Sequence, residues 1–174
     1  MKVSVIITCH NESAYIEQCI NSIIDQTDYD NIYEIIVVDD GSTDTSPQIL
    51  AKLKLNCEKL KIFTTKGLGL PSARNIGIKS ASSDFIAFLD GDDYWTDPNK
   101  LQTQFDIMET NSEYSFTFHS VSVKNEIKSI NYSYPTPSKK ILAFNDILKK
   151  HYKPTCSVFF RREMYPKPEP DFLI

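Results

Sequence analysis

Short runs of apolar and β-branched residues recur along the chain and restrict its fold more than any other feature. Residues 3–8, 35–38, 60–64 and 85–89 form such runs and contain few polar positions. A strand buried on both faces of a parallel sheet has this composition, because neither row of its side chains meets water. We therefore expect these runs to be strands of a largely parallel sheet.

Segments with the spacing of amphipathic helices separate these runs. Residues 15–26 repeat apolar side chains on one helical face, and Ser13 is positioned to cap this helix. A second helix should begin at Asp44 or Ser46, and a third should begin at Pro71. Strands that alternate with helices in this way form βαβ units, which predicts a Rossmann-like α/β fold with helices on both faces of the sheet.

The pattern weakens after a fourth expected helix at residues 99–109. A loosely alternating stretch indicates a strand within residues 114–123, and a stretch rich in Pro and Ser indicates a loop at 132–140. Residues 144–151 are expected to form a helix and residues 156–161 another strand. The length of 174 residues suits one domain.

Charge and composition exclude several classes of protein. A net charge of -4 without a basic stripe argues against a nucleic-acid partner. No stretch approaches the roughly 20 apolar residues of a membrane-spanning helix, so a cytoplasmic protein is expected, with peripheral membrane contact left open. The cysteines are scattered without a close pair, which predicts buried free thiols at Cys9, Cys19, Cys57 and Cys156.

Polar motifs follow three of the expected strands. They occupy residues 8–12, 39–44 and 90–93, and the last contains Asp90, Asp92 and Asp93. In open parallel sheets, ligands gather at the carboxyl ends of the strands, so these motifs should share one site. Closely spaced carboxylates repel each other unless a cation compensates, which suggests Mg²⁺ or Mn²⁺ with a nucleotide diphosphate. The alternative is a solvated turn, because Asp and Gly also favour turns.

Four motifs in this order resemble the family-2 inverting glycosyltransferases with the GT-A fold. The residues that carry the resemblance are Val5-Ile6-Ile7-Thr8-x-x-Asn11-Glu12, Val37-Val38-Asp39-Asp40-Gly41-Ser42-Thr43-Asp44, Gly69-x-x-x-Ala73-Arg74-Asn75-x-Gly77 and Leu89-Asp90-Gly91-Asp92-Asp93. The resemblance implies a single GT-A domain, with a nucleotide-binding half at residues 1–110 and the start of an acceptor-side half at residues 111–174. It also implies a UDP-sugar donor and a carbohydrate or lipid-linked acceptor, in cell-surface polysaccharide or glycolipid synthesis at the inner face of the membrane.

The resemblance assigns roles to individual residues. Asp92 would bind Mn²⁺ or Mg²⁺ with help from Asp90, Asp40 would accept the imide N–H of uracil, and Arg74 would reach the donor diphosphate. The full set implied for donor binding is Thr8, Asn11, Glu12, Asp39, Asp40, Arg74 and Asp90. Structural alternatives stay open, because Asn11, Glu12 and Asp39 could shape turns or helix ends and Arg74 could be an exposed helix residue.

Two further points follow from the same comparison. Tyr94 and Trp95 could form a platform for a sugar ring or belong to the core. The family's general base, an Asp in a Glu-Asp pair, has no convincing match, since Asp171 lacks the family's spacing and Asp93 would only support the site. The base is therefore expected beyond Ile174, in a chain cut short at its carboxyl end.

Two other classes of protein remain as alternatives. A sugar nucleotidyltransferase also combines a doubly wound sheet with metal-binding acids, but it usually needs a basic, Gly-rich loop after the first strand, which residues 8–12 lack. A non-catalytic module that binds nucleotide sugars would explain why the base is missing. Release of UDP, release of pyrophosphate, or binding without release would separate the three.

Overall fold

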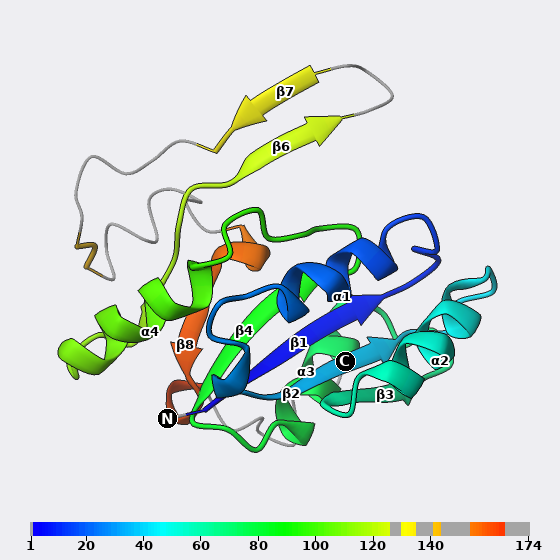
Figure 1. Cartoon of the computed structure of the whole chain (residues 1–174), viewed down its shortest axis with the longest axis horizontal. Coiled ribbons are helices and arrows are strands. Elements are labelled where there is room, and N and C mark those ends of the chain that lie inside the picture. Colours follow the sequence, from blue (N-terminus) through cyan, green and yellow to red (C-terminus); the bar gives the residue numbers. More distant parts are fainter. Residues whose placement is uncertain (1, 126–129, 135–140, 144–153, 166–174) are drawn as a thin grey trace.

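A six-stranded, mostly parallel sheet forms the centre of the computed structural model, which describes residues 2–125, 130–134, 141–143 and 154–165 (Figure 1). Its order is β3-β2-β1-β4-β8-β5. The bounds are β1 (Val3–Cys9), β2 (Ile32–Asp39), β3 (Leu60–Thr64), β4 (Phe85–Asp90), β5 (Phe116–Thr117) and β8 (Phe159–Arg161). Strands β1 to β4 are parallel, whereas β8 runs antiparallel to β4 and β5. The expected parallel core is confirmed.

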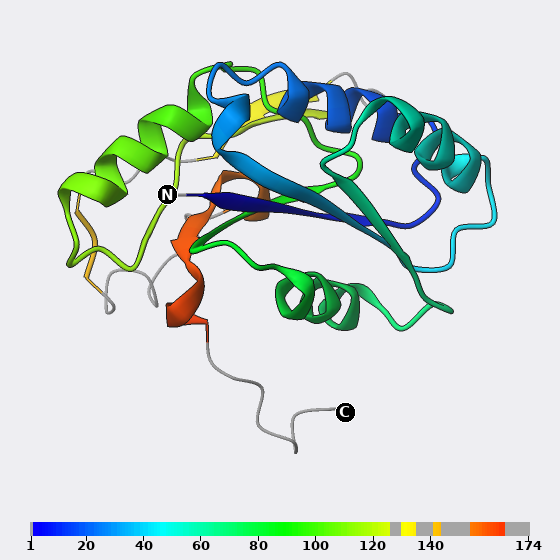
Figure 2. The same cartoon turned by 60° about the horizontal axis from the view of Figure 1, so that its bottom comes forward.

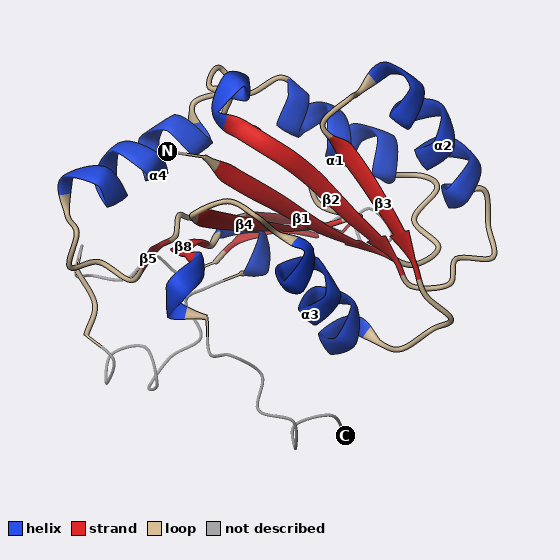
Figure 3. Cartoon of the chain, turned by 90° about the horizontal axis from the view of Figure 1, so that it is seen from below, coloured by secondary structure: helices blue, strands red, loops and turns tan. Residues whose placement is uncertain are grey.

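Helices cover both faces of this sheet and complete a three-layer α/β/α fold (Figure 2, Figure 3). Helices α1 (Ile16–Ile24), α2 (Ser46–Asn56) and α4 (Lys100–Thr110) lie on one face, and α3 (Leu70–Ser80) lies on the other. Strand β1 is buried throughout, with Val5 and Ile7 in the core beneath α1 and Ile6 in the core beneath α3. The continuous apolar run of β1 therefore has a direct cause, because both of its faces are covered.

Helix α3 packs closely on β1 because Gly77 lacks a side chain. A Cβ atom at this position would overlap Cγ2 of Ile6, which is fully buried. Because α3 supplies Arg74 to the carboxyl edge of the sheet, this close contact also fixes the height of that side chain above β1 and β4.

Some local expectations were wrong. The stretch at residues 114–123 is divided between β5 and β6 (Ser122–Asn125), and β6 pairs with β7 (Ile130–Ser133) in a separate two-stranded sheet (Figure 1). The last expected strand is reduced to β8, because Thr155–Ser157 forms a 3₁₀ turn. Two further 3₁₀ turns cover Tyr29–Asn31 and Arg162–Met164. The expected helix at 144–151 lies outside the described residues, as does most of the expected loop at 132–140.

The expected cap of α1 is also wrong. Tyr15 occupies the N-cap position without a side-chain hydrogen bond, and the backbone amide of Ser13 donates instead to Oδ2 of Asp44 at 3.0 Å. All four cysteines are buried and free, as predicted. Among the residues that the structure describes, no helix is long and apolar enough to cross a membrane.

Candidate functional site

The polar motifs after β1, β2 and β4 meet at the carboxyl edge of the sheet. Thr8 pairs with Asp90 in the parallel register of β1 and β4, and its hydroxyl donates to Oδ1 of Asp90 at 2.9 Å. The Thr8 carbonyl accepts the amide of Gly91 at 2.9 Å. The acidic motif is thus fixed to the end of β1 from its first residue.

Asp40 organises the loop that follows β3. Its carboxylate accepts hydrogen bonds from the hydroxyl of Thr65, from the amide of Leu68 at 2.7 Å and from the amide of Gly69 at 2.7 Å. Burial acts to raise the pKa of Asp40, but these hydrogen bonds outweigh it and hold the pKa below its usual value. The side chain is therefore an ionised acceptor, and three of about four lone-pair positions are already used.

Asn11 and Asp39 hold the turn that follows β2. Oδ1 of Asn11 accepts the amide of Thr43 at 2.7 Å, and Asn11 adopts a positive φ of 59°. Oδ1 of Asp39 accepts the amide of Ser42 at 3.0 Å, and the Asp39 side chain is buried. Both residues therefore stabilise the turn, which was the alternative to donor binding. Their contact with a donor stays a prediction.

Arg74 lies over the acidic motif and is not a free surface arginine. Its Nη2 donates to Oδ1 of Asp90 at 2.8 Å and to Oδ2 at 3.1 Å, and the two side chains are each 27% exposed. The same nitrogen reaches the hydroxyl of Thr155 at 3.3 Å, whereas the buried Nε has no partner. Arg74 thus compensates one carboxylate and retains a buried Nε–H donor without a partner among the described residues.

Glu12 lies directly beneath Gly91. A Cβ atom at residue 91 would overlap Oε2 of Glu12, which is buried without a hydrogen-bond partner. Burial, followed by the charges of Asp92, Asp90 and Asp93, raises the pKa of Glu12 to about 8, while a hydrogen bond from the His10 backbone opposes this change. Glu12 does not cap α1 with its side chain. The raised pKa favours the protonated form of Glu12 at neutral pH.

This proton gives a testable dependence of stability on pH. Folding raises the pKa of Glu12 from 4.5 to about 8, so the folded protein binds more protons between these values and its free energy of unfolding falls as pH rises. Glu12→Gln removes this dependence. Because the Glu12 residue as a whole is only partly buried, we expect the variant to gain only about 1 kcal/mol over the parent on going from about pH 5 to about pH 9.

Urea unfolding without metal or nucleotide at the two pH values measures this gain. Glu109→Gln, which changes an exposed carboxyl on α4, is the matched control and should follow the parent. Parallel pH profiles for the parent and Glu12→Gln would contradict the assignment of a raised pKa.

Asp92 is the carboxylate of the motif that is free to bind a cation. It is exposed and makes no hydrogen bond or ion pair with the other described residues, whereas Asp90 is engaged by Arg74 and Thr8. Burial raises the pKa of Asp93, and a hydrogen bond with Cys156 opposes the rise. Within the described ranges, no three His, Cys, Asp or Glu residues are grouped to hold an ion. A Mg²⁺ or Mn²⁺ ion at Asp92 would therefore need further oxygen ligands from substrate phosphates, a mode in which one or two protein carboxylates suffice.

The two aromatic residues after the motif have different environments. Trp95 is 7% exposed and belongs to the core, and its Nε1 donates to the carbonyl of Cys156 at 3.0 Å. The Lys100 ammonium lies 3.7 Å from the centre of its ring. Tyr94 is 38% exposed. The core interpretation holds for Trp95, so only Tyr94 of this pair is available to a sugar.

Two contributors to the site were not identified from the sequence. Thr155 contacts Arg74 from a segment 81 residues away, and no local pattern indicates such a contact. The loop at residues 65–69 gives two amides and a hydroxyl to Asp40. Gly69 belongs to one of the four family motifs, but that motif did not identify the carboxylate that the loop surrounds.

Sequence and structure comparisons with known proteins agree with one another. Residues 4–167 match the family model described as glycosyl transferase family 2. An uncharacterized glycosyltransferase of Nostoc is 31% identical over 173 residues, which cover 96% of this chain and 53% of that protein. The crystal structure of S. aureus TarS 1-349 is 26% identical with a TM-score of 0.69, over 93% of this chain and 47% of that one.

A mannosyltransferase from Pyrobaculum calidifontis shares the fold with a TM-score of 0.69 at 20% identity, over 93% of this chain and 45% of that structure. The chain thus spans about half the length of these relatives.

Proposed function

The chain belongs to glycosyl transferase family 2 and has its GT-A type of fold, and we propose that it binds a UDP-sugar and transfers the sugar to a hydroxyl acceptor with inversion. The observation that carries this proposal is the meeting of Asp40, the Arg74–Asp90 pair and Asp92 at one edge of the sheet. This arrangement combines an acceptor for a base, a cation for a diphosphate and a free carboxylate for a metal ion. A carbohydrate or lipid-linked acceptor used in cell-surface synthesis is part of the proposal.

Asp40 supports uridine as the nucleoside. Its ionised carboxylate has about one lone-pair position left after the bonds from residues 65–69, which suits a single donor such as the uracil imide N–H. Cytosine lacks a donor at this position, so Asp40 would select against it. The crystal structures of TarS 1-349 with UDP and with UDP-GlcNAc are consistent with this choice of donor.

Arg74 and Asp92 would act on the diphosphate. Arg74 would donate to a phosphate oxygen with a nitrogen that now contacts Asp90 and Thr155. Asp92 would hold Mn²⁺ or Mg²⁺, which supplies positive charge to the diphosphate leaving group when it is bound. The mannosyltransferase from Pyrobaculum calidifontis that shares the fold was crystallised with GDP-Man and Mn²⁺. Thr8 would keep Asp90 in place while Arg74 changes partner.

Inversion requires one displacement at the anomeric carbon. The acceptor oxygen forms a bond to this carbon, the bond to the diphosphate oxygen breaks, UDP leaves, and the acceptor proton passes to a general base. Asp90 is paired with Arg74, and Glu12 is buried beneath Gly91. We propose that none of these described carboxylates is the base and that Asp93 supports the site. Asp171, the weak candidate, lies outside the described residues.

Titration calorimetry tests the donor proposal. We expect UDP to bind in the presence of Mn²⁺ with micromolar to millimolar affinity, and CDP to bind at least about 10-fold more weakly because cytosine has no N–H at this position to donate a hydrogen bond to Asp40. Adding chelator should reduce UDP affinity. Folded protein that shows no heat with millimolar UDP and Mn²⁺, or that binds CDP equally well, would refute the donor site as assigned.

A further inference from the structure

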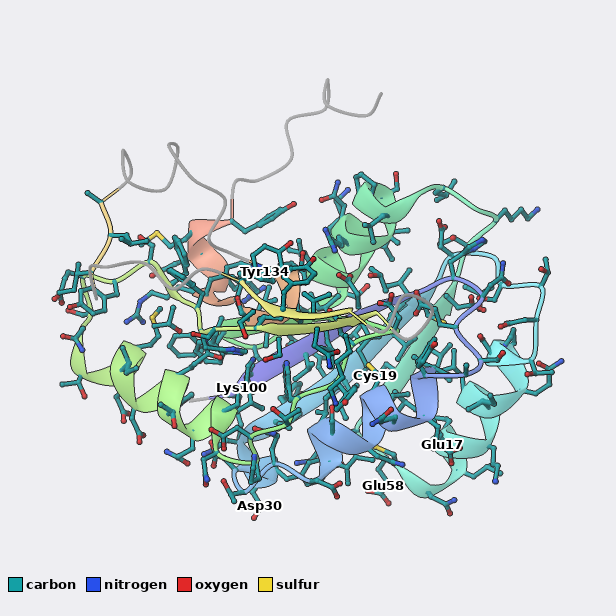
Figure 4. All side chains as sticks on the ribbon, turned by 90° about the horizontal axis from the view of Figure 1, so that it is seen from above. Glu17, Cys19, Asp30, Glu58, Lys100 and Tyr134 are labelled. Carbon is teal, nitrogen blue, oxygen red and sulfur yellow. The ribbon has the colours of Figure 1, made fainter. Side chains whose placement is uncertain are left out.

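A hollow in the surface lies beside the acidic motif, between the outer face of α1 and the segment at residues 94–98. It has a volume of about 570 Å³. Its lining residues are Ala14, Glu17, Gln18, Asn21, Ser22, Asp25, Gln26, Tyr94, Trp95, Thr96 and Pro98. Figure 4 shows that Glu17 points away from the sheet, whereas Cys19 on the same helix points towards it. We call this hollow the α1 groove.

The floor of the α1 groove is fixed by hydrogen bonds. The amide of Trp95 donates to the hydroxyl of Ser22 at 3.1 Å, and Nε2 of Gln26 donates to the carbonyl of Asp97 at 2.9 Å. The amide of Thr27 donates to the carbonyl of Pro98 at 2.9 Å. These bonds hold residues 95–98 along α1, so the groove is formed before any ligand arrives and costs little to order.

The walls, in contrast, carry polar groups without partners. The side chains of Glu17, Gln18, Asn21 and Asp25 are exposed and make no hydrogen bond or ion pair to the other described residues. Amides offer both donors and acceptors, carboxylates offer acceptors, and the 38% exposed ring of Tyr94 offers an apolar face. A saccharide matches this set, because its hydroxyl groups both donate and accept and its C–H faces pack on aromatic rings.

Charge narrows the class of saccharide. The lining contains two carboxylates, Glu17 and Asp25, and no lysine or arginine. Repulsion would therefore oppose a polymer that carries phosphate or carboxylate groups, whereas neutral sugars and amino sugars are compatible with the groove. The negatively charged diphosphate of a UDP-sugar would be repelled from the groove for the same reason.

The groove adjoins the site proposed for the donor. Tyr94, which lines the groove, directly follows Asp93. The thiol of Cys19 on α1 donates to the carbonyl of Asp90 at 3.6 Å, so α1 contacts the end of β4. We propose that the α1 groove binds a neutral or amino-sugar oligosaccharide, the acceptor chain of the transfer described above. The acceptor role rests on the proposed function, whereas binding of the oligosaccharide does not.

Chemical-shift mapping on ¹⁵N-labelled protein tests the groove without UDP or metal. The probes are chitotetraose, cellotetraose and mannotetraose as neutral chains, a glucosamine tetramer as an amino-sugar chain, and a hyaluronan tetrasaccharide as an anionic chain. At least one neutral or amino-sugar probe should shift amides at residues 17–25 and 94–98 in a saturable way, and hyaluronan should not. Asn21→Ala should weaken that binding about 2-fold to 10-fold, as expected for one hydrogen bond.

Gln48→Ala, which removes an exposed amide from α2, is the matched control and should bind the probe like the parent. The proposal is overturned if none of the neutral or amino-sugar probes shifts these amides, if hyaluronan binds there equally well, or if Asn21→Ala binds like Gln48→Ala. Titration calorimetry with UDP on Asn21→Ala distinguishes the groove proposal from the donor-site proposal, because the variant should bind UDP like the parent. UDP binding without saccharide binding refutes only the groove, whereas saccharide binding without UDP binding refutes the donor site and, with it, the acceptor role.

Discussion

Arg74→Ala is expected to reduce UDP affinity in the presence of Mn²⁺ by about 100-fold, which corresponds to about 2.7 kcal/mol. Two effects act in the same direction. The variant loses the cation proposed to bind the diphosphate, and it leaves Asp90 without its ion pair close to Glu12, Asp92 and Asp93. The added negative charge would repel an anionic ligand. Calorimetry with UDP and Mn²⁺ measures the loss.

Two controls decide what the loss means. Arg74→Lys keeps the positive charge without the planar donor group, and it should recover only part of the affinity. Lys79→Ala removes an exposed cation from the same helix and should leave UDP binding unchanged. Full affinity in Arg74→Ala would show that Arg74 does not bind the diphosphate, and an equal loss in Lys79→Ala would show that the loss reflects net charge and not a contact with Arg74.

Asp92→Asn is expected to abolish most of the gain in UDP affinity that Mn²⁺ provides. Asp92 is the exposed carboxylate of the motif, and an amide oxygen is a much weaker ligand for a hard cation. We expect the affinity with Mn²⁺ to fall by about 100-fold. In chelator, the variant should bind UDP as well as the parent or slightly better, because one negative charge is gone.

The comparison between Mn²⁺ and chelator is what makes this test specific for a metal ligand. A general disturbance of the site would weaken UDP binding under both conditions. Asp84→Asn removes an exposed carboxylate just before β4, at the opposite end from Asp92, and should behave like the parent. If Mn²⁺ improves UDP binding equally in Asp92→Asn and in the parent, Asp92 is not the ligand.

Much of the sheet could be predicted because its signal is local. Residues 3–8 form a strand in any context that covers both faces, and β1 follows this run closely at Val3–Cys9. Pro71 marks the start of α3 for a similarly local reason, since its ring suits the first turn of a helix. Strand β5 was harder to place because its partner β8 comes more than 40 residues later, and only that pairing decides which residues of the stretch are extended.

The candidate site could likewise be predicted only in part from the sequence. Carboxylates after strand ends could be recognised from the sequence, and the parallel order of β2, β1 and β4 brings them to one edge. Their individual environments could not be recognised. Asp90 and Asp92 differ by two positions, yet one is paired with Arg74 and the other is exposed. The sequence left open whether Trp95 is part of a sugar platform or of the core, and its packing in the core decides for the second.

By itself, the sequence determined the layered fold, the edge of the sheet that carries the polar motifs and the family that those motifs resemble, because each depends on residues close together in the chain. The tertiary structure alone decided that Asp90 is paired with Arg74, that burial raises the pKa of Glu12 and that Asp92 is exposed. The α1 groove also depends on the tertiary structure, because its two sides are a helix and a segment about 70 residues apart in the chain. Charge compensation and burial depend on distances across the fold, and those distances exist only after β1, β4 and α3 have packed together.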